Sequence, residues 1–369
     1  MNKCYYCEKK LVSKDEFNQK NLDTKTYTIT HEEHIIQNAI GGFLKSSDIL
    51  CEKCGGQLND KIDVKFISIF KNLCNNLKII IERDTKPKNF TKGTFTFYNK
   101  NITINTNFYR EQWMIHKSDF FFLEEQNKIL LILNKSTKRE YIIKKIESDP
   151  RYNPNYAIIE INDLQNLEGF ISSEFKLTNE AFKLGMAKIA IGYASYLQLD
   201  KSNLNNVLQN KNFKEIIFLP YYVNSDEQRN FESSFEPAFS PYHILYIFNI
   251  KTMNEHHLIC YIDLLSTFKG FIILNNDYKG REINELYYRK TTNLNNQENN
   301  WLNQFKEIKF IEDYKKMIKK SYTDINIFID SEQRKIEYLN SVKHSNHYYF
   351  YRLTSYISLL NMDKDYIKL

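Results

Sequence analysis

The stretch "HEEHIIQNAIGG", residues 31–42, decides how the N-terminal part of the chain is interpreted. Two acidic residues stand directly before a histidine, apolar residues follow, and a glycine pair ends the stretch. A surface helix would not need the glycines, and a buried strand would exclude the acidic residues. The flanking sequences "CYYC" (residues 4–7) and "CEKC" (residues 51–54) indicate that a metal-framed module encloses the stretch.

The composition predicts a folded, cytoplasmic protein. A chain of 369 residues with 42% hydrophobic and 15% aromatic residues can bury the cores of two or three domains, which excludes a disordered polar chain. The longest apolar runs, such as "ILLIL" at residues 129–133, have strand length, and the first residues lack the apolar segment of a signal peptide. We expect no membrane partner. The net charge of +6 permits a nucleic-acid partner but does not argue for one.

The cysteines favour zinc over disulfides. Four of the six lie within the first 54 residues as two Cys-x-x-Cys pairs, and four thiolates are the ligand set of a closed tetrahedral Zn²⁺ site. Two reactive redox pairs are the alternative, but redox chemistry needs only one pair. We predict a structural zinc ion with no open position for chemistry, held by Cys4, Cys7, Cys51 and Cys54. Cys74 and Cys260 are expected to be ordinary buried thiols.

The remaining pattern predicts an α+β fold. Apolar residues at three- and four-residue steps indicate a helix around residues 62–73, and alternating residues between 93 and 162 predict an antiparallel sheet. After residue 172 a helix rich in small residues, suited to close packing, precedes three strand candidates. We expect three domains: a zinc-framed N-terminal module (1–84), a β-rich segment (85–165) and a mixed α/β region (166–369).

The N-terminal segment resembles a known family. The matching residues are "EEHII", the glycine pair at 41–42, "DILCEKC", and the polar "GGQLNDKID" that begins a helix. Together they resemble an HNH endonuclease module, the ββα-metal fold with a zinc-ribbon frame, over roughly the first 65 to 80 residues. This resemblance implies an N-terminal zinc-framed nuclease module, with strands before and after the "HEEHIIQNAIGG" stretch; we expect the second at residues 48–50.

The chemistry of phosphodiester hydrolysis explains the residue types. An imidazole suits the general base that activates water near neutral pH, and we assign this role to His34. We expect Glu33 to bind a catalytic Mg²⁺ or Mn²⁺ ion, which prefers oxygen ligands. The resemblance implies a central residue that orients the histidine, usually asparagine. Asp48 occupies that place here, and its carboxylate could accept the ring N–H of His34.

Other departures from the family concern Gln37, where proline is common, and the helix ligand of the catalytic metal. The family often has Asn or His directly after the second cysteine pair, but this chain has Gly55, which offers no ligand atom. Asn59, one helical turn later, is our substitute, and Asp60 is the weaker alternative. His31 is expected to be a neighbour of the site, with phosphate contact as the alternative role.

Three functions fit the sequence. The first is a metal-dependent endonuclease that cuts double-stranded DNA, of the restriction or phage-defence kind, with a C-terminal recognition region. The second is a nuclease effector activated by a ligand or partner, and the third is a non-catalytic zinc-framed DNA-binding protein with a decayed site. Cutting both strands would need a homodimer or sequential nicking. Aromatic and basic clusters at 286–292 and 347–353 could bind DNA, but a buried aromatic core is favoured.

Overall fold

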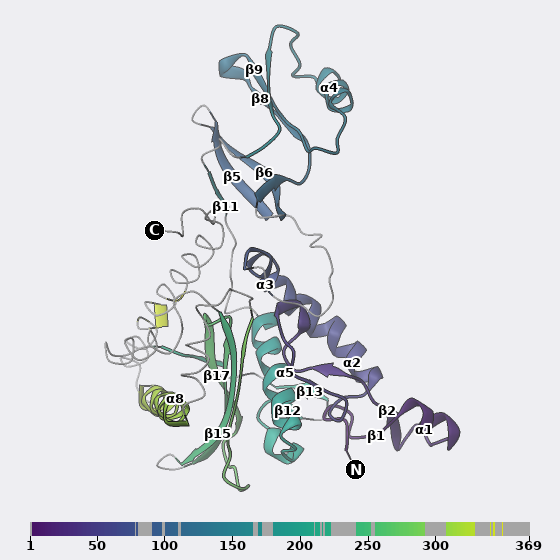
Figure 1. Cartoon of the computed structure of the whole chain (residues 1–369), viewed down its shortest axis with the longest axis vertical. Coiled ribbons are helices and arrows are strands. Elements are labelled where there is room, and N and C mark those ends of the chain that lie inside the picture. Colours follow the sequence, from purple (N-terminus) through teal and green to yellow (C-terminus); the bar gives the residue numbers. More distant parts are fainter. Residues whose placement is uncertain are drawn as a thin grey trace. The chain divides into compact units, whose positions relative to one another are not determined.

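The computed structural model divides the chain into two compact units (Figure 1). Unit 1 comprises Met1–Phe70, Leu77–Asp84 and Lys176–Leu369, and unit 2 comprises Lys71–Asn76 and Thr85–Phe175. Mixed helices and sheets confirm the α+β class. The expected three-domain division stays a prediction. The structure describes residues 2–77, 79, 91–97, 100–109, 112–164, 169–171, 180–209, 211–214, 216, 218–222, 241–251, 255–291, 308–328, 340, 342–343 and 349.

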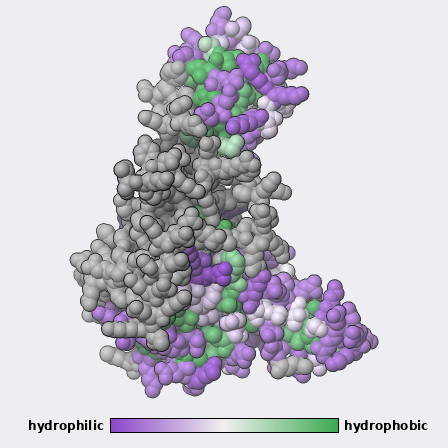
Figure 2. All heavy atoms as spheres, viewed as in Figure 1, coloured by the Kyte–Doolittle hydropathy of each residue, from purple (hydrophilic) through white to green (hydrophobic). Residues whose placement is uncertain are grey.

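Unit 1 begins with a small parallel sheet and a capped helix. Strand β1 (Lys10–Val12) pairs with β2 (Tyr27–Ile29), and helix α1 (Lys14–Gln19) lies between them in the sequence. The hydroxyl of Ser13 accepts a hydrogen bond from the N–H of Glu16 at 3.1 Å, which satisfies one of the free donors at the helix start. Helix α1 buries no residue, and Figure 2 shows mostly hydrophilic residues at this part of the surface.

A short hairpin and a helix follow, in the ββα order that the resemblance implies. Strand β3 (Glu33–His34) pairs antiparallel with β4 (Lys45–Ser46), and the 3₁₀ turn η1 (Asn38–Ile40) lies in the loop between them. Helix α2 (Glu52–Leu58) continues through the π-helical turn η2 (Asn59–Asp63) into α3 (Val64–Asn76).

The expected second strand at residues 48–50 was misplaced, because β4 forms at Lys45–Ser46 instead. The backbone of residues 49–50 is used differently. The carbonyl of Ile49 accepts from the N–H of Tyr5 at 2.9 Å, and that of Leu50 accepts from the N–H of His31 at 3.0 Å. These bonds tie the segment to the first cysteine pair and to His31, so it does not pair with β3.

The glycine pair allows the loop after β3 to turn tightly. Gly41 ends η1 in the left-handed region at φ 88°, where a residue with a Cβ atom would be strained. A Cβ atom at Gly42 would lie 1.8 Å from the carbonyl oxygen of Ile36. The loop after β3 therefore requires glycine at both positions.

The C-terminal part of unit 1 is a five-stranded antiparallel sheet covered on both faces by helices. The three predicted strands are confirmed as β15 (Tyr242–Lys251), β16 (His256–Leu264) and β17 (Phe268–Asn275). The two edge strands, β14 (Phe218–Pro220) and β18 (Asn284–Lys290), were not predicted from the sequence. Smaller elements precede the sheet: η4 (Lys201–Leu204), β12 (Leu208–Gln209) and β13 (Asn212–Phe213).

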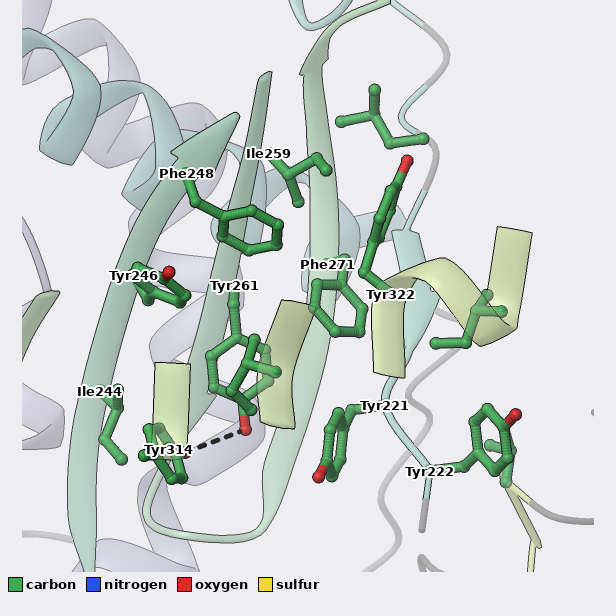
Figure 3. Close-up of a cluster of buried hydrophobic side chains, with 14 of the residues drawn as sticks. Tyr221, Tyr222, Ile244, Tyr246, Phe248, Ile259, Tyr261, Phe271, Tyr314 and Tyr322 are labelled. Atoms are coloured by element: carbon green, nitrogen blue, oxygen red, sulfur yellow. Dashed lines mark hydrogen bonds between the residues drawn. The ribbon is translucent and has the colours of Figure 1, made fainter. Parts of the chain in front are cut away.

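An aromatic core fills one face of this sheet, beneath helix α8 (Ile308–Phe328) (Figure 3). Tyr246, Phe248, Tyr261 and Phe271 alternate along the strands and meet Tyr314 and Tyr322 of α8, and the hydroxyl of Tyr314 donates to that of Tyr261 at 3.5 Å. The aromatic cluster at 286–292 contributes to this core through Leu286 and Tyr288. Apart from Tyr349, which is buried, the cluster at 347–353 lies outside the described residues.

Helix α5 (Glu180–Tyr196) packs between the other face of the sheet and the N-terminal module (Figure 1). A Cβ atom at Gly185 would lie 2.0 Å from the ring of Phe66, so the helices approach each other closely at this point. The ring of Phe70 lies 4.9 Å, centroid to centroid, from that of Phe268 on β17. The close packing predicted from the small residues is thus confirmed, and it joins the N-terminal module to the C-terminal sheet in one core.

Unit 2 corrects the expectation of a single antiparallel sheet. It has an antiparallel sheet in the order β11-β5-β6-β7 and a second sheet in the order β10-β9-β8, in which β10 and β9 are parallel. A parallel pair needs a crossover, which helix α4 supplies. The elements are β5 (Thr91–Phe97), β6 (Lys100–Tyr109), β7 (Gln112–Ile115), β8 (Asp119–Leu123), η3 (Glu124–Gln126), β9 (Lys128–Ile132), α4 (Arg139–Glu147), β10 (Ala157–Ile161) and β11 (Gly169–Ile171).

None of the helices in the described part of the chain combines the length and the apolar character that crossing a membrane requires.

Candidate functional site

The four N-terminal cysteines come together as predicted. Their sulfur atoms all lie within 4.8 Å of one another, and the Sγ atoms of Cys7 and Cys51 are 3.8 Å apart. Four sulfurs at about 2.3 Å from one zinc ion are about 3.8 Å apart in a tetrahedron, so the cluster fits Zn²⁺. Within the described ranges, no other group of three or more His, Cys, Asp or Glu side chains has this arrangement.

Backbone hydrogen bonds hold the segments that carry the cysteines. The N–H of Cys4 donates to the carbonyl of Lys9 at 2.9 Å, and the N–H of Gly55 donates to the carbonyl of Cys51 at 2.8 Å. Hydrogen bonds from the thiols of Cys4 and Cys54 hold the pKa of Cys51 well below its ordinary value, which favours the thiolate that binds zinc. Cys74 and Cys260 are buried as expected, and burial raises the pKa of each.

The predicted metal ligand Glu33 and the predicted base His34 are neighbours on β3, opposite β4. Glu33 pairs with Ser46 and His34 with Lys45 in the strand register. Because successive side chains on a strand point to opposite faces, the two side chains leave the strand in different directions. Glu33 is 7% exposed, and His34 is half-buried.

A lysine from α5 contacts the carboxylate of Glu33. The Nζ atom of Lys188 lies 2.7 Å from Oε1 of Glu33 and 2.5 Å from Oδ2 of Asp63, and the lysine side chain is only 3% exposed. The amide nitrogen of Gln37 donates to Oδ1 of Asp63 at 2.7 Å. The N-terminal module and helix α5 therefore share one buried polar network.

The charges of this network affect one another. Burial alone would raise the pKa of Glu33, but the interactions with His31 and with the charge of Lys188 outweigh it, so the pKa lies below its ordinary value. Burial raises the pKa of Asp63, and Lys188 and Gln37 offset only part of that effect. The interaction with the carboxylate of Glu33 raises the pKa of His31, although burial acts in the opposite direction. Glu33 is thus held as a carboxylate between two basic groups.

His31 lies closer to the site than the sequence suggested. Its Nε2 atom is 3.5 Å from Oε2 of Glu33, and its ring packs against Gly55 at the start of α2. A Cβ atom at Gly55 would lie 2.7 Å from Cδ2 of this ring. The glycine that departs from the family pattern is therefore the residue that admits the imidazole.

The other predicted residues lie around this centre, and their roles stay predictions. Asp48 is exposed in the bend after β4, where its N–H donates to the hydroxyl of Ser46 at 3.1 Å. Asn59 begins the π-helical turn, and its amide nitrogen donates to Oδ1 of Asp60 at 3.2 Å. Both Asn59 and Asp60 are exposed.

Three members of the network were not predicted from the sequence: Lys188, Asp63 and Gln37. One signal was present: Lys188 stands within "GMAKIAIGY", residues 185–193, an otherwise apolar helical run. Lysine is almost never fully buried without a partner, so its position predicted a buried acid somewhere in the fold. Which acid it contacts depends on tertiary structure alone.

The β3–β4 loop also contacts the C-terminal sheet. Nε2 of His243 on β15 lies 2.7 Å from the carbonyl oxygen of Ile40, and the N–H of Leu265 donates to Nδ1 of the same ring at 3.3 Å. The guanidinium of Arg289 on β18 lies 3.6 Å from the ring centroid of Phe43. The conformation of the loop that carries the glycine pair therefore depends on the sheet as well as on the zinc module.

Comparisons with known proteins agree with this geometry. Neither a curated protein nor a solved structure matches the chain. A family model described as HNH endonuclease matches residues 4–71, which span the cysteine cluster, the β3–β4 hairpin, α2 and part of α3. The N-terminal segment of the chain, residues 4–71, is therefore an HNH endonuclease domain.

Proposed function

We propose that the protein is a metal-dependent endonuclease that hydrolyses phosphodiester bonds in DNA. The observation that carries the proposal is the pair on β3, a buried carboxylate next to a half-buried histidine, framed by the four-cysteine cluster in a segment that matches the HNH family. The paired carboxylate of Glu33 and the nitrogen of His31 are suitable donors for a divalent ion.

The residues have distinct parts in the proposed reaction. His34 accepts the proton of the attacking water, and Asp48 orients its ring. Glu33 contributes to the binding of the divalent ion, Mg²⁺ or Mn²⁺, and Asn59 is the proposed helix ligand. Such an ion supplies positive charge that stabilises the phosphate as it reacts. The zinc ion of the cysteine cluster fixes the first residues against α2 and has no part in the chemistry.

Cleavage of supercoiled plasmid by the zinc-loaded protein tests the proposal. Wild type should nick or linearise the plasmid with Mg²⁺ or Mn²⁺ and stop when EDTA is added briefly enough to spare the zinc. His34→Ala should lose the activity, whereas the matched control His116→Ala, a partly exposed histidine of unit 2, should keep it. Equal cleavage by wild type and His34→Ala would reject His34 as the base.

A second candidate is an effector whose C-terminal region controls the nuclease, and the Lys188–Glu33 contact favours it. On this account wild type cuts only after a ligand or partner is added. The restriction or phage-defence role, recognition of DNA by the C-terminal region and a homodimer that cuts both strands are parts of the first proposal. Analytical ultracentrifugation with and without DNA tests the dimer.

A further inference from the structure

The imidazole of His31 fills the space that a side chain at position 55 would occupy. A Cβ atom at Gly55 would lie 2.7 Å from Cδ2 and 3.1 Å from Nε2 of His31. In comparison, a Cβ atom at Gly56, the next position on α2, would meet no atom within 4 Å. At position 55 of α2, the side chain of His31 therefore occupies the space that a side chain of the helix would otherwise fill.

The nitrogen that reaches this place faces Glu33 at a distance suited to a shared ion. Nε2 of His31 and Oε2 of Glu33 are 3.5 Å apart, which is long for a direct hydrogen bond between these groups. Two ligand atoms at about 2.1 Å from one ion are about 3.4 Å apart at a tetrahedral angle and about 3 Å apart at a right angle. The observed separation of 3.5 Å is close to the tetrahedral value and about 0.5 Å above the right-angle value, so a small rotation of either side chain would bring both atoms to one ion.

Lys188 holds the other oxygen of the same carboxylate. It contacts Oε1 of Glu33, which leaves Oε2 directed toward His31. The network contains two carboxylates, Glu33 and Asp63, against the single ammonium of Lys188, so a net negative charge remains next to the imidazole. The side chain of His31 is 40% exposed, which leaves the pair accessible from solvent.

We propose that His31 and Glu33 bind the catalytic divalent ion together, with His31 supplying from the strand side the ligand that α2 lacks at Gly55. This inference rests on the proposed nuclease function and names the ligands and the ion class of its site. An imidazole nitrogen beside a carboxylate oxygen favours transition-metal ions such as Mn²⁺ over Mg²⁺, which prefers oxygen donors. Asn59, water and phosphate oxygens of the substrate complete the coordination.

Metal binding without DNA tests the proposal. The full-length protein, loaded with one zinc ion per chain, is titrated with Mn²⁺ and separately with Mg²⁺ by calorimetry, and bound Mn²⁺ is counted by electron paramagnetic resonance. Wild type should bind one Mn²⁺ ion, more tightly than Mg²⁺. His31→Ala should weaken Mn²⁺ binding at least about tenfold, since even the loss of an outer-shell partner has that effect. The control His116→Ala should bind Mn²⁺ as wild type does.

Moving the ligand from the strand to the helix gives a second, independent test. Gly55→Asn should displace the His31 ring because of the 2.7 Å approach and therefore also weaken Mn²⁺ binding. In the double variant His31→Ala/Gly55→Asn the space is free and an amide oxygen is available, so ion binding should return and Mg²⁺ should bind more tightly than it does to wild type. Zinc content and circular dichroism show whether each variant is folded.

Unchanged Mn²⁺ affinity in folded His31→Ala, or a wild type that binds no ion beyond zinc, would overturn the proposal. The plasmid assay separates this failure from failure of the proposed function. Cleavage that needs His34 but not His31 would support the nuclease function and reject His31 as a ligand. Conversely, Mn²⁺ binding through His31 in a protein that cuts no DNA would support the metal site and reject a nuclease that is active without an activator.

Discussion

Replacement of Lys188 by methionine removes the ammonium between Glu33 and Asp63 and keeps a side chain of similar length. The Nζ atom lies 2.7 Å from one carboxylate and 2.5 Å from the other, and the lysine side chain is 3% exposed. Removing one partner of a buried ion pair costs about 3–5 kcal/mol, because the remaining charge is buried without compensation. Two carboxylates depend on this lysine, so we expect Lys188→Met to lose about 4–5 kcal/mol, near the top of that range.

The loss should depend on pH. Burial already raises the pKa of Asp63 in the presence of Lys188, and without the lysine the folded-state pKa values of Asp63 and Glu33 should both rise above their unfolded values. A carboxyl group of this kind destabilises the folded state when it is ionised and ceases to do so as pH falls through its folded pKa. The deficit of the variant should therefore be greatest above neutral pH and shrink in acid.

Native-state hydrogen exchange at the amides of α5 and β3 is the appropriate assay, because a whole-chain signal would mix two compact units. Exchange is compared for wild type and variant at pH 7.5 and pH 5. Lys183→Met, a half-buried lysine on the same helix, is the matched control for the loss of a charge and should change stability by less than about 0.5 kcal/mol. A loss below about 1 kcal/mol for Lys188→Met at pH 7.5, or a deficit that grows in acid, would refute the reasoning.

Three other predictions concern stability. Burial lowers the pKa of His243 to about 4. Because the unfolded chain then takes up the proton first, the free energy of unfolding of wild type should fall by about 3 kcal/mol between pH 7 and pH 4. In urea unfolding, the stability of His243→Gln should depend less on pH. Gly185→Ala should destabilise the protein by about 1–3 kcal/mol through its clash with Phe66. Gly56→Ala, at a position of α2 with free space around it, should stabilise it by up to about 1 kcal/mol. Equal changes in melting temperature for the two variants would contradict this. Metal analysis should find one zinc ion per chain and none in Cys54→Ser, whose amides between β1 and α2 should lose exchange protection.

Local sequence signals predicted much of this architecture. Cysteine spacing predicted the metal cluster, and apolar periodicity predicted the helix around Phe66 and three strands of the C-terminal sheet. These features depend on a few neighbouring residues, so a single sequence is sufficient to show them. The glycine pair belongs to the same class, because a left-handed turn at Gly41 requires a residue without Cβ.

Features that depend on distant partners were missed or misplaced. The second strand of the hairpin was expected at residues 48–50, but the backbone there is engaged by Tyr5 and His31. The parallel pairing of β10 with β9 depends on α4, whose charged sequence gave only a weak apolar pattern. The contact of Lys188 with Glu33 joins residues 155 positions apart in the sequence, a separation at which no local pattern operates.

The same long-range contacts bear on how the nuclease could be controlled. Lys188 of α5 holds one oxygen of Glu33, while His243 and Arg289 of the sheet hold the loop that follows β3. A ligand changes an equilibrium only through contacts that differ between two states, so an activator bound to the C-terminal region would have to alter one of these contacts. In a constitutive nuclease the active conformation already has these contacts. Variants at Arg289, an exposed residue of β18, can distinguish the two: Arg289→Ala should raise basal cleavage in a controlled effector and lower it, or leave it unchanged, in a constitutive enzyme.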